Sequence, residues 1–191
     1  MTAIVKTELE LPEPARSKGK LAFLLDNVLS QEECQEFIDE MEAPGDWQDA
    51  LVNVGFGEQQ MMSDVRKSKR KLVFDEEKAG MIFERIKEYL PPQWEGQPIV
   101  GLNERLSVLK YNPGDYFKPH MDGVYVRENQ SEKSYITIQL YLNEGFEGGN
   151  TTFLDGRAEK GGLKGKDTLF STFTKFDLYF QVCSKVGERR M

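Results

Sequence analysis

The stretch SYITIQLYLN, residues 134–143, alternates apolar and polar side chains over the length of one β-strand. Side chains at every second position of a strand share a face. One face would therefore carry Ile136, Ile138, Leu140 and Leu142, and the other would carry Thr137, Gln139, Tyr141 and Asn143. A strand of this kind predicts a sheet with one packed face and one polar face that lines a cavity.

Segments on both sides of this strand also favour β structure. ERLSVLKY (104–111) and NTTFLD (150–155) have strand length and composition, and the turn sequences NPGD and EGFEGGN separate them from residues 134–143. Further upstream, KLAFLLDNVLS (20–30) predicts a short apolar strand. The second half of the chain is therefore expected to form an antiparallel β region.

Two amphipathic helices are expected before this β region. SQEECQEFIDEM (30–41) has Ser30 as its N-cap and Glu33 three positions later, the reciprocal pair of a capping box. DEEKAGMIFERIKEYLPP (75–92) begins at Asp75, and its two final prolines stop the helix. Helices followed by antiparallel strands predict an α+β fold, in which the helices support a sandwich or barrel.

Composition limits the class of protein. A chain of 191 residues with 39% hydrophobic and 11% aromatic residues is typical of one soluble globular domain. The net charge of -7 argues against nucleic acid as a partner, because a phosphate backbone would repel such a surface. Two cysteines are too few for a disulfide framework, and no window approaches the roughly 18 apolar residues of a membrane span. These features predict a cytoplasmic protein without a membrane partner.

The basic run RKSKRK (66–71) lies between the two expected helices. Its simpler interpretation is a solvated loop between strands. The alternative is a surface that receives an acidic or peptide substrate near a cleft.

The segment DYFKPHMDG (115–123) contains the only histidine of the chain, His120, two positions before Asp122. In an extended segment these two side chains point to the same face and converge on one point. A histidine and a carboxylate, completed by another histidine, form the facial triad that binds Fe(II). The spacing H-x-D is common by chance, so a loop histidine without a metal remains the alternative at this stage.

The surroundings of His120 carry more information. RLSVLKYNPGDYFKPHMDG (105–123), followed by YITIQLYLNEGFEGGNTTFL (135–154), resembles the Fe(II)- and 2-oxoglutarate-dependent dioxygenases of the prolyl 4-hydroxylase-like branch in both order and spacing. The resemblance implies a double-stranded β-helix, or jelly roll, with two supporting helices. It implies Fe(II), 2-oxoglutarate as cosubstrate and L-ascorbate as the reductant of the iron. The implied reaction is hydroxylation of a C–H bond in a protein, peptide, amino-acid or other small-molecule substrate.

The same resemblance implies a role for five residues. His120 and Asp122 would be two iron ligands. Tyr111, Tyr141 and Thr151 would lie around the cosubstrate, with the Tyr141 hydroxyl meeting a cosubstrate carboxylate. Considered alone, Tyr141 fits a half-buried structural position in a sheet better than a site position, and Tyr111 fits a structural position at least as well.

The chain departs from the family after Asp155. The family has a second histidine on a late strand and a basic residue beyond it, whereas this chain has one histidine in all. Residues 156–191 carry eight basic and four acidic side chains, a balance opposite to that of the rest of the chain. Replacement ligands are open among Cys183, Asp177 and Glu188, and replacement cosubstrate anchors among Lys175, Lys185 and Arg189.

These features predict a flexible lead-in at 1–20, a dioxygenase-like domain at 21–155 and an atypical segment at 156–191. The β core is expected to be incomplete at its C-terminal end, and exposed strand edges predict marginal stability. Two alternatives to an active dioxygenase remain open. One is a non-catalytic binding module, or a truncated isoform, on the same scaffold. The other is a zinc or acidic-ligand site without redox chemistry.

Overall fold

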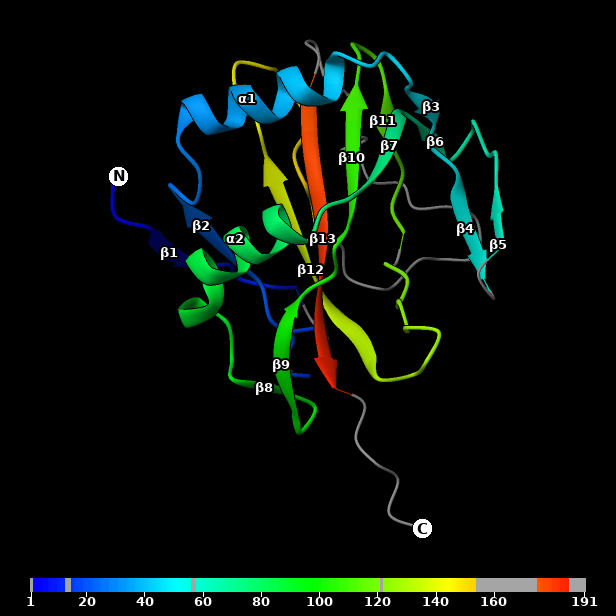
Figure 1. Cartoon of the computed structure of the whole chain (residues 1–191). Helices are drawn as coiled ribbons and strands as arrows, with labels where there is room; N and C mark the ends of the chain where they lie inside the picture. Colours follow the sequence, from blue (N-terminus) through cyan, green and yellow to red (C-terminus); the bar gives the residue numbers. More distant parts are fainter. Residues whose placement is uncertain (1, 13–14, 56–57, 121, 154–174, 186–191) are drawn as a thin grey trace.

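An antiparallel sheet of seven strands organises the chain in the computed structural model (Figure 1). The structure describes residues 2–12, 15–55, 58–120, 122–153 and 175–185, and within the last range only the side chain of Cys183. Helices and mostly antiparallel strands occur together in these ranges, which confirms the α+β class.

The sheet has the order β3-β7-β10-β13-β9-β8, and β12 pairs with the other edge of β13. Its strands are β3 (Gln48–Asp49), β7 (Lys69–Phe74), β8 (Gln93–Trp94), β9 (Gln97–Leu102), β10 (Arg105–Tyr111), β12 (Glu132–Tyr141) and β13 (Lys175–Lys185). The expected strands at 104–111 and 134–143 are therefore confirmed as β10 and β12.

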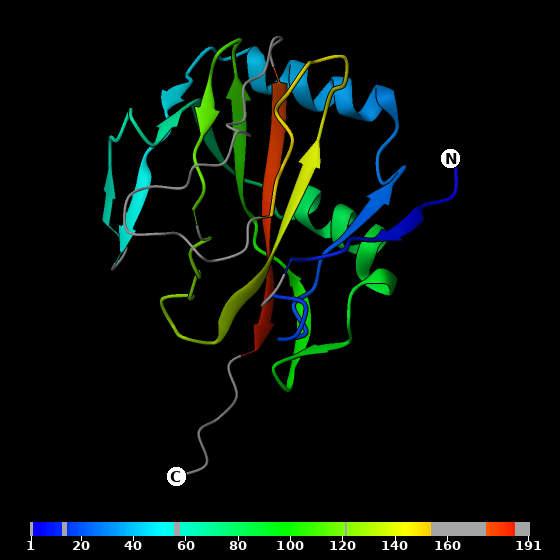
Figure 2. The same cartoon turned by 180° about the vertical axis from the view of Figure 1, so that it is seen from behind.

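The strand β13 lies at the centre of this sheet (Figures 1 and 2). Along one edge it pairs with β10 and then with β9, and along the other edge it pairs with β12. At Leu178, for example, the partners are Val108 on one side and Leu140 on the other. The segment beyond Asp155, where the sequence departs from the family, thus supplies the strand with the most neighbours.

Three two-stranded sheets surround the main sheet. They are β1 (Val5–Glu8) with β2 (Phe23–Asp26), β4 (Val52–Gly55) with β5 (Glu58–Gln60), and β6 (Arg66–Lys67) with β11 (Tyr116–Phe117). The strand β1 lies within the expected lead-in, and β2 confirms the short strand expected at 20–30.

The helices α1 (Gln31–Glu42) and α2 (Glu76–Ile86) cover one face of the sheet (Figure 1). At α1 the predicted capping box is present, because the Glu33 N–H donates to Ser30 Oγ and the Ser30 N–H donates to Glu33. At α2 the side chain of Asp75 caps the first turn. The helix ends earlier than its sequence pattern suggested, and the 3-10 helix Lys87–Tyr89 continues it to the prolines.

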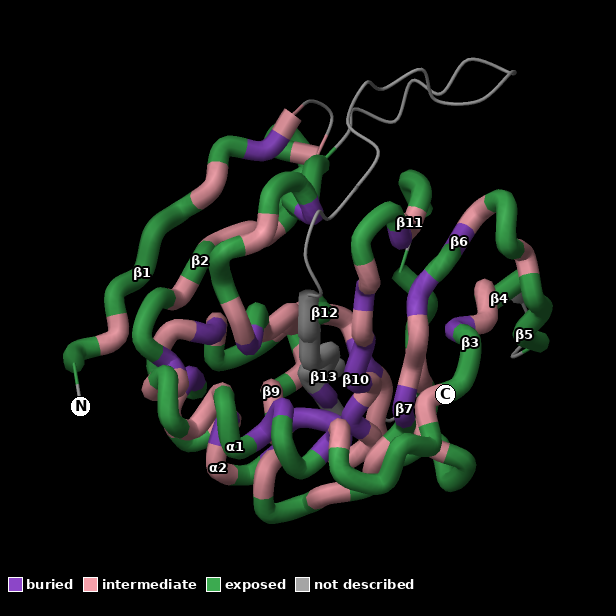
Figure 3. Tube along the Cα trace, turned by 90° about the horizontal axis from the view of Figure 1, so that it is seen from above, coloured by how far each residue is buried: buried purple, intermediate pink, exposed green. Residues whose placement is uncertain are grey.

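The buried residues of the hydrophobic core lie on the two helices, on strands of the sheet and on the segments that adjoin them (Figure 3). Its buried members are Val28, Phe37, Ile38, Met41, Ala79, Ile82, Ile86, Leu90, Leu102, Leu106, Val108 and Leu142. Ile136, Ile138 and Leu140 of β12 pack against this cluster, so the apolar face predicted for residues 134–143 is turned toward the helices. Each large aliphatic side chain that is fully removed from water contributes about 1.5–3 kcal/mol.

Two expectations about local structure are wrong. The run at 66–71 is not a solvated loop, because it forms β6 and the start of β7, and Lys71 is buried with its ammonium group bonded to the Met41 carbonyl at 2.6 Å. Residues 150–153, the described part of the expected strand at 150–155, are not a strand. There Thr151 contacts β12 through side-chain oxygens instead of a backbone ladder.

The described strands do not close into a barrel. The jelly roll implied by the family resemblance is therefore not confirmed by these ranges. None of the helices in the described part of the chain has the length and apolar character needed to cross a membrane.

Candidate functional site

The turn after β10 positions the histidine segment. In the turn 112–115 the Asp115 N–H donates to the Asn112 carbonyl at 2.9 Å, and Gly114 has a φ of 81°. The Asp115 carboxylate, which is buried, accepts from the Asn112 N–H at 2.9 Å and pairs with Lys67 at 3.1 Å. The sequence NPGD thus fixes where β11 begins, since glycine adopts the left-handed conformation at no steric cost.

The strand β11 is fastened to β6. Phe117 pairs with Arg66 in the ladder, and the Lys118 N–H donates to the Val65 carbonyl at 2.9 Å. The Tyr116 hydroxyl donates to the Ser63 carbonyl at 2.6 Å. These contacts hold the chain immediately before His120 on the face of the sheet that is turned away from the helices (Figure 2).

The ring of His120 is oriented by two contacts. Its Nδ1 lies 2.8 Å from the Lys118 carbonyl oxygen, which can only accept, so Nδ1 carries a proton and donates it. The ring also stacks on Phe117, with centroids 3.5 Å apart and planes inclined by 15°. In the neutral imidazole the lone pair is then on Nε2. Ligand histidines are commonly held in this way, by a hydrogen bond from the other ring nitrogen to a carbonyl.

Asp122 faces the same nitrogen. His120 Nε2 and Asp122 Oδ1 are 3.5 Å apart, so the predicted convergence of the two side chains is present. When His120 Nε2 carries a proton, its hydrogen bond to the carboxylate is the largest cause that lowers the pKa of Asp122, and a hydrogen bond from the Thr137 side chain and the charge of Arg66 act in the same direction. Partial burial opposes them. The carboxylate is therefore held ionised, and a proton or another cation fits between the two side chains.

This pair fits two of the ligands that a metal ion needs. Two donor atoms that each bind one metal at about 2.1 Å lie no more than about 4.2 Å apart, and the separation of 3.5 Å is within that limit. Within the described ranges, no group of three or more histidine, cysteine or acidic side chains gathers to bind a metal. Both side chains are partly exposed, at 34% for His120 and 51% for Asp122.

The replacement ligands considered from the sequence have different positions. Cys183 is buried on β13, paired with Ser134, and does not join His120 and Asp122 within the described residues. Burial is the largest cause that raises the pKa of its thiol, to about 11, and the carboxylate of Glu132 adds to it. The side chain of Asp177 and residue Glu188 lie outside what the structure describes, as do the side chains of Lys175 and Lys185 and residue Arg189.

The polar side of β12 continues from Thr137 toward the other predicted residues. The Tyr141 hydroxyl and Thr151 Oγ1 are 2.6 Å apart, and Thr151 Oγ1 donates to Gln139 Oε1 at 3.1 Å. Thr137, Gln139 and Tyr141 alternate with the core residues of β12, so this chain of hydroxyl and amide groups shares a face with Asp122. Tyr111, at the end of β10, is buried with 6% exposure.

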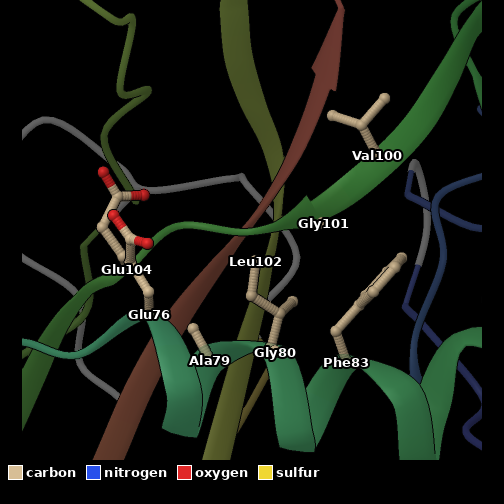
Figure 4. Close-up of a pocket in the computed structure, with 8 residues that line it drawn as sticks. All are labelled: Glu76, Ala79, Gly80, Phe83, Val100, Gly101, Leu102 and Glu104. Atoms are coloured by element: carbon tan, nitrogen blue, oxygen red, sulfur yellow. The ribbon is translucent and has the colours of Figure 1, made fainter.

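Two hollows, each of about 190 Å³, lie elsewhere. Figure 4 shows the first, between α2 and β9, with Phe83 and Val100 toward one end and the carboxylates of Glu76 and Glu104 at the other. The second lies at the edge formed by β3 and β6, and Arg66 contributes to its wall. Neither is lined by His120 or Asp122.

The sequence interpretation did not include Phe117, the Lys118 carbonyl or Arg66, which support the pair. The Arg66 guanidinium lies over the Phe117 ring at 4.3 Å, on the side chain that stacks on His120. A signal for Arg66 was available, because the run RKSKRK alternates arginine and lysine with the period of a strand.

No protein-family model matches the chain, and no curated protein is similar to it. Any functional assignment therefore depends on the geometry described above and on the sequence resemblance of residues 105–123 and 135–154.

Proposed function

We propose that this chain has the scaffold of a prolyl 4-hydroxylase-like, Fe(II)- and 2-oxoglutarate-dependent dioxygenase, in which His120 and Asp122 bind the iron. The observation that carries the proposal is the approach of His120 Nε2 to Asp122 Oδ1 at 3.5 Å. The Lys118 carbonyl accepts a hydrogen bond from His120 Nδ1, and a hydrogen bond from the Thr137 side chain helps to lower the pKa of Asp122. Such supporting hydrogen bonds are typical of metal ligands.

The arrangement of strands is consistent with this scaffold. The antiparallel sheet packs its apolar face against two helices and carries the candidate residues on the opposite face. The pair β6–β11 extends from that face, and we propose that it begins the second wall of a double-stranded β-helix, with the seven-stranded sheet as the first wall.

The residues of this chain would divide the work as follows. His120 and Asp122 would hold Fe(II), and the hydroxyls of Tyr141 and Thr151 would bind a carboxylate of 2-oxoglutarate, with Tyr111 packed below them in the sheet. When bound, iron and cosubstrate would supply the oxidation, in which 2-oxoglutarate, O₂ and a C–H group of the substrate give succinate, CO₂ and a C–OH group. L-ascorbate would keep the iron reduced. The protein positions and protects this chemistry.

One observation favours a second candidate, a non-catalytic binding module on the same scaffold. The described residues offer two metal-ligating side chains at the site, not three. A metal held by two protein ligands is weakly anchored, and open coordination positions alone do not direct O₂. This candidate binds a metal ion and a carboxylate ligand without turnover.

The test measures metal binding and turnover on the same preparation. Purified chain would be titrated with Co(II) or Fe(II) under anaerobic conditions and then assayed for conversion of 2-oxoglutarate to succinate. His120→Ala is expected to weaken metal binding at least tenfold and to abolish turnover. Lys118→Ala is the matched control, because it removes an exposed side chain and keeps the carbonyl that accepts from His120.

The outcomes separate the candidates. Turnover that requires His120 supports the dioxygenase, and metal binding that requires His120 without turnover supports the binding module. Equal metal binding by the wild-type protein and His120→Ala would contradict both.

A further inference from the structure

The basic run RKSKRK at 66–71 is divided by the strand period into two sets. Residues at every second position of an extended chain lie on the same side. The arginines therefore share a side with Ser68, to which Arg66 Nε donates at 3.1 Å. The three lysines alternate with them on the other side.

The lysines are neutralised by aspartates. Lys67 pairs with Asp115 at 3.1 Å and Lys69 with Asp49 at 2.7 Å. Lys71 pairs with Asp46 at 2.5 Å. The charge of each lysine is therefore balanced by a carboxylate of the protein, and we expect these side chains to have a structural role.

The arginines are not neutralised in this way. No carboxylate of the described chain lies within ion-pair distance of Arg66 or Arg70. Arg66 is 8% exposed, and its Nη1 donates to the Leu51 carbonyl at 3.3 Å. Arg70 Nη2 donates to the Gln59 amide oxygen at 2.9 Å. Buried charges in proteins are normally paired, so a buried guanidinium with neutral partners is an unmet electrostatic requirement.

Arg70 lies on the same face of the sheet as the candidate metal site. Arg70 pairs with Leu109 across the sheet, and Leu109 shares a side of β10 with Tyr111. The alternate residues of β10 are turned to the helices, since Val108 is in the core and Lys110 donates to Glu42 at 2.7 Å. Arg70 therefore belongs to the face that carries Thr137 and Asp122.

The positive charges of Arg66 and Arg105 act on Arg70. Burial is the largest cause that lowers the pKa of Arg70, and the neighbouring charges of Arg66 and Arg105 add to it. Like charges that lie close together without a counter-ion attract an anion. The charge of Arg66 acts on the Asp122 carboxylate, but no carboxylate of the described ranges forms an ion pair with Arg66 or Arg70.

We propose that Arg66 and Arg70 form a carboxylate-binding subsite beside His120 and Asp122, and that the ligand of this face is a small-molecule carboxylate. A planar guanidinium donates two parallel hydrogen bonds to a carboxylate, which gives direction as well as affinity. The subsite itself does not require the metal, whereas the choice of ligand rests on the proposed function. The carboxylate belongs either to the cosubstrate or to the substrate.

The subsite is tested on metal-free protein, with EDTA present and succinate as the probe. Succinate has no keto group, so its binding reports the arginines without a contribution from a chelated metal. Wild-type protein is expected to bind succinate in a salt-dependent manner, with shifts of the Arg66 and Arg70 Nε–Hε resonances. Arg70→Gln is expected to weaken this binding about tenfold.

Lys69→Gln is the matched control, because it removes the same charge one residue away on the other side of β7. It is expected to change succinate affinity less than twofold. Arg66→Lys is the second variant, since it retains the buried charge and removes the fork of donors. Equal succinate binding by Arg70→Gln, Lys69→Gln and wild-type protein would overturn the proposal.

The source of the carboxylate is tested on Co(II)-loaded protein with 2-oxoglutarate and 2-oxopentanoate, which has a methyl group in place of the far carboxylate. Weaker binding of 2-oxoglutarate alone to Arg70→Gln assigns the carboxylate to the cosubstrate. Unchanged binding of both, with the succinate effect retained, assigns it to the substrate. His120→Ala is expected to leave succinate binding unchanged, so failure of the metal site and failure of the subsite give different results.

Discussion

At the scale of single residues, the orientation of His120 comes mainly from the backbone and from one aromatic ring. The Lys118 carbonyl determines which ring nitrogen carries the proton, and Phe117 fixes the plane of the ring. Asp122, by contrast, depends on side chains, because Thr137, and His120 when its Nε2 is protonated, hydrogen-bond to its carboxylate. The two candidate ligands therefore differ in how easily a substitution disturbs them.

Thr137→Val tests the support of Asp122. The substitution keeps the shape and β-branching of the side chain and removes the hydroxyl that bonds to the carboxylate. Metal affinity is expected to fall about tenfold, the lower end of the effect of such supporting groups, while the melting temperature stays nearly constant because Thr137 is exposed. The check is a Co(II) titration followed by absorbance, together with a thermal melt.

Thr151→Val is the control for this change. Its hydroxyl bonds to Tyr141 and Gln139 and not to Asp122, so metal affinity should be retained. A fall of the same size in both variants would show that Thr137 has no particular role in holding the carboxylate.

At the scale of elements, a bidentate ion pair joins α1 and α2. Arg85 of α2 donates to both oxygens of Glu33 of α1, at 2.6 and 2.9 Å, and to the Val28 carbonyl at 3.0 Å. Glu33 is also the partner of Ser30 in the capping box. One carboxylate therefore stabilises the start of α1 and its packing against α2.

These contacts predict a pH dependence of stability. The hydrogen bonds from Arg85 and Ser30 lower the pKa of Glu33 from 4.5 to about 2. Because the pKa is lower in the folded state, the stabilisation is complete above about pH 4.5 and is lost as the pH falls toward 2. The shift corresponds to about 3 kcal/mol, which partial exposure of the pair reduces to about 1–2 kcal/mol.

Glu33→Gln is expected to lower the free energy of unfolding by about 1–2 kcal/mol at pH 7 and by much less at pH 2.5. Urea unfolding at the two pH values measures the difference. Glu36→Gln, at an exposed position of the same helix, should change neither value by more than about 0.5 kcal/mol. A deficit of Glu33→Gln that is equal at both pH values would rule out the ion pair as its cause.

At the scale of the whole molecule, the central position of β13 makes the C-terminal segment part of the fold. The strand pairs with β9, β10 and β12, which would otherwise present unpaired edges. Unpaired edges are sites of aggregation. Whether the chain has the marginal stability expected of an incomplete sheet therefore depends on how firmly β13 is paired.

Leu178→Pro tests the role of β13, because the backbone of residue 178 has a strand on each side. Proline removes a hydrogen bond of the ladder and distorts it, so the expected loss is about 3 kcal/mol or more and includes loss of cooperative unfolding in urea. The matched change is Thr7→Pro in β1, a strand with β2 as its partner in the described sheets. It should cost clearly less, and equal losses would contradict a central role for β13.

The sequence by itself determined the elements whose signals are local. The capping box at Ser30 and Glu33, the turn at 112–115 and the alternation along 134–143 are patterns of neighbouring residues, and all three form as expected. The convergence of His120 and Asp122 belongs to this class, because two positions in an extended chain share a face whatever surrounds them.

Tertiary structure decided what depends on distant partners. Lys71 is buried because the Met41 carbonyl and the Asp46 carboxylate accept from its ammonium group. The sequence of the run 66–71 does not predict either partner. In the same way, β13 became a central strand because β9, β10 and β12 left an edge that it could pair with, and Arg66 came to lie over Phe117 because β6 pairs with β11. Hydrogen-bond ladders and ion pairs between remote segments depend on three-dimensional proximity, and residue spacing along one chain carries no record of it.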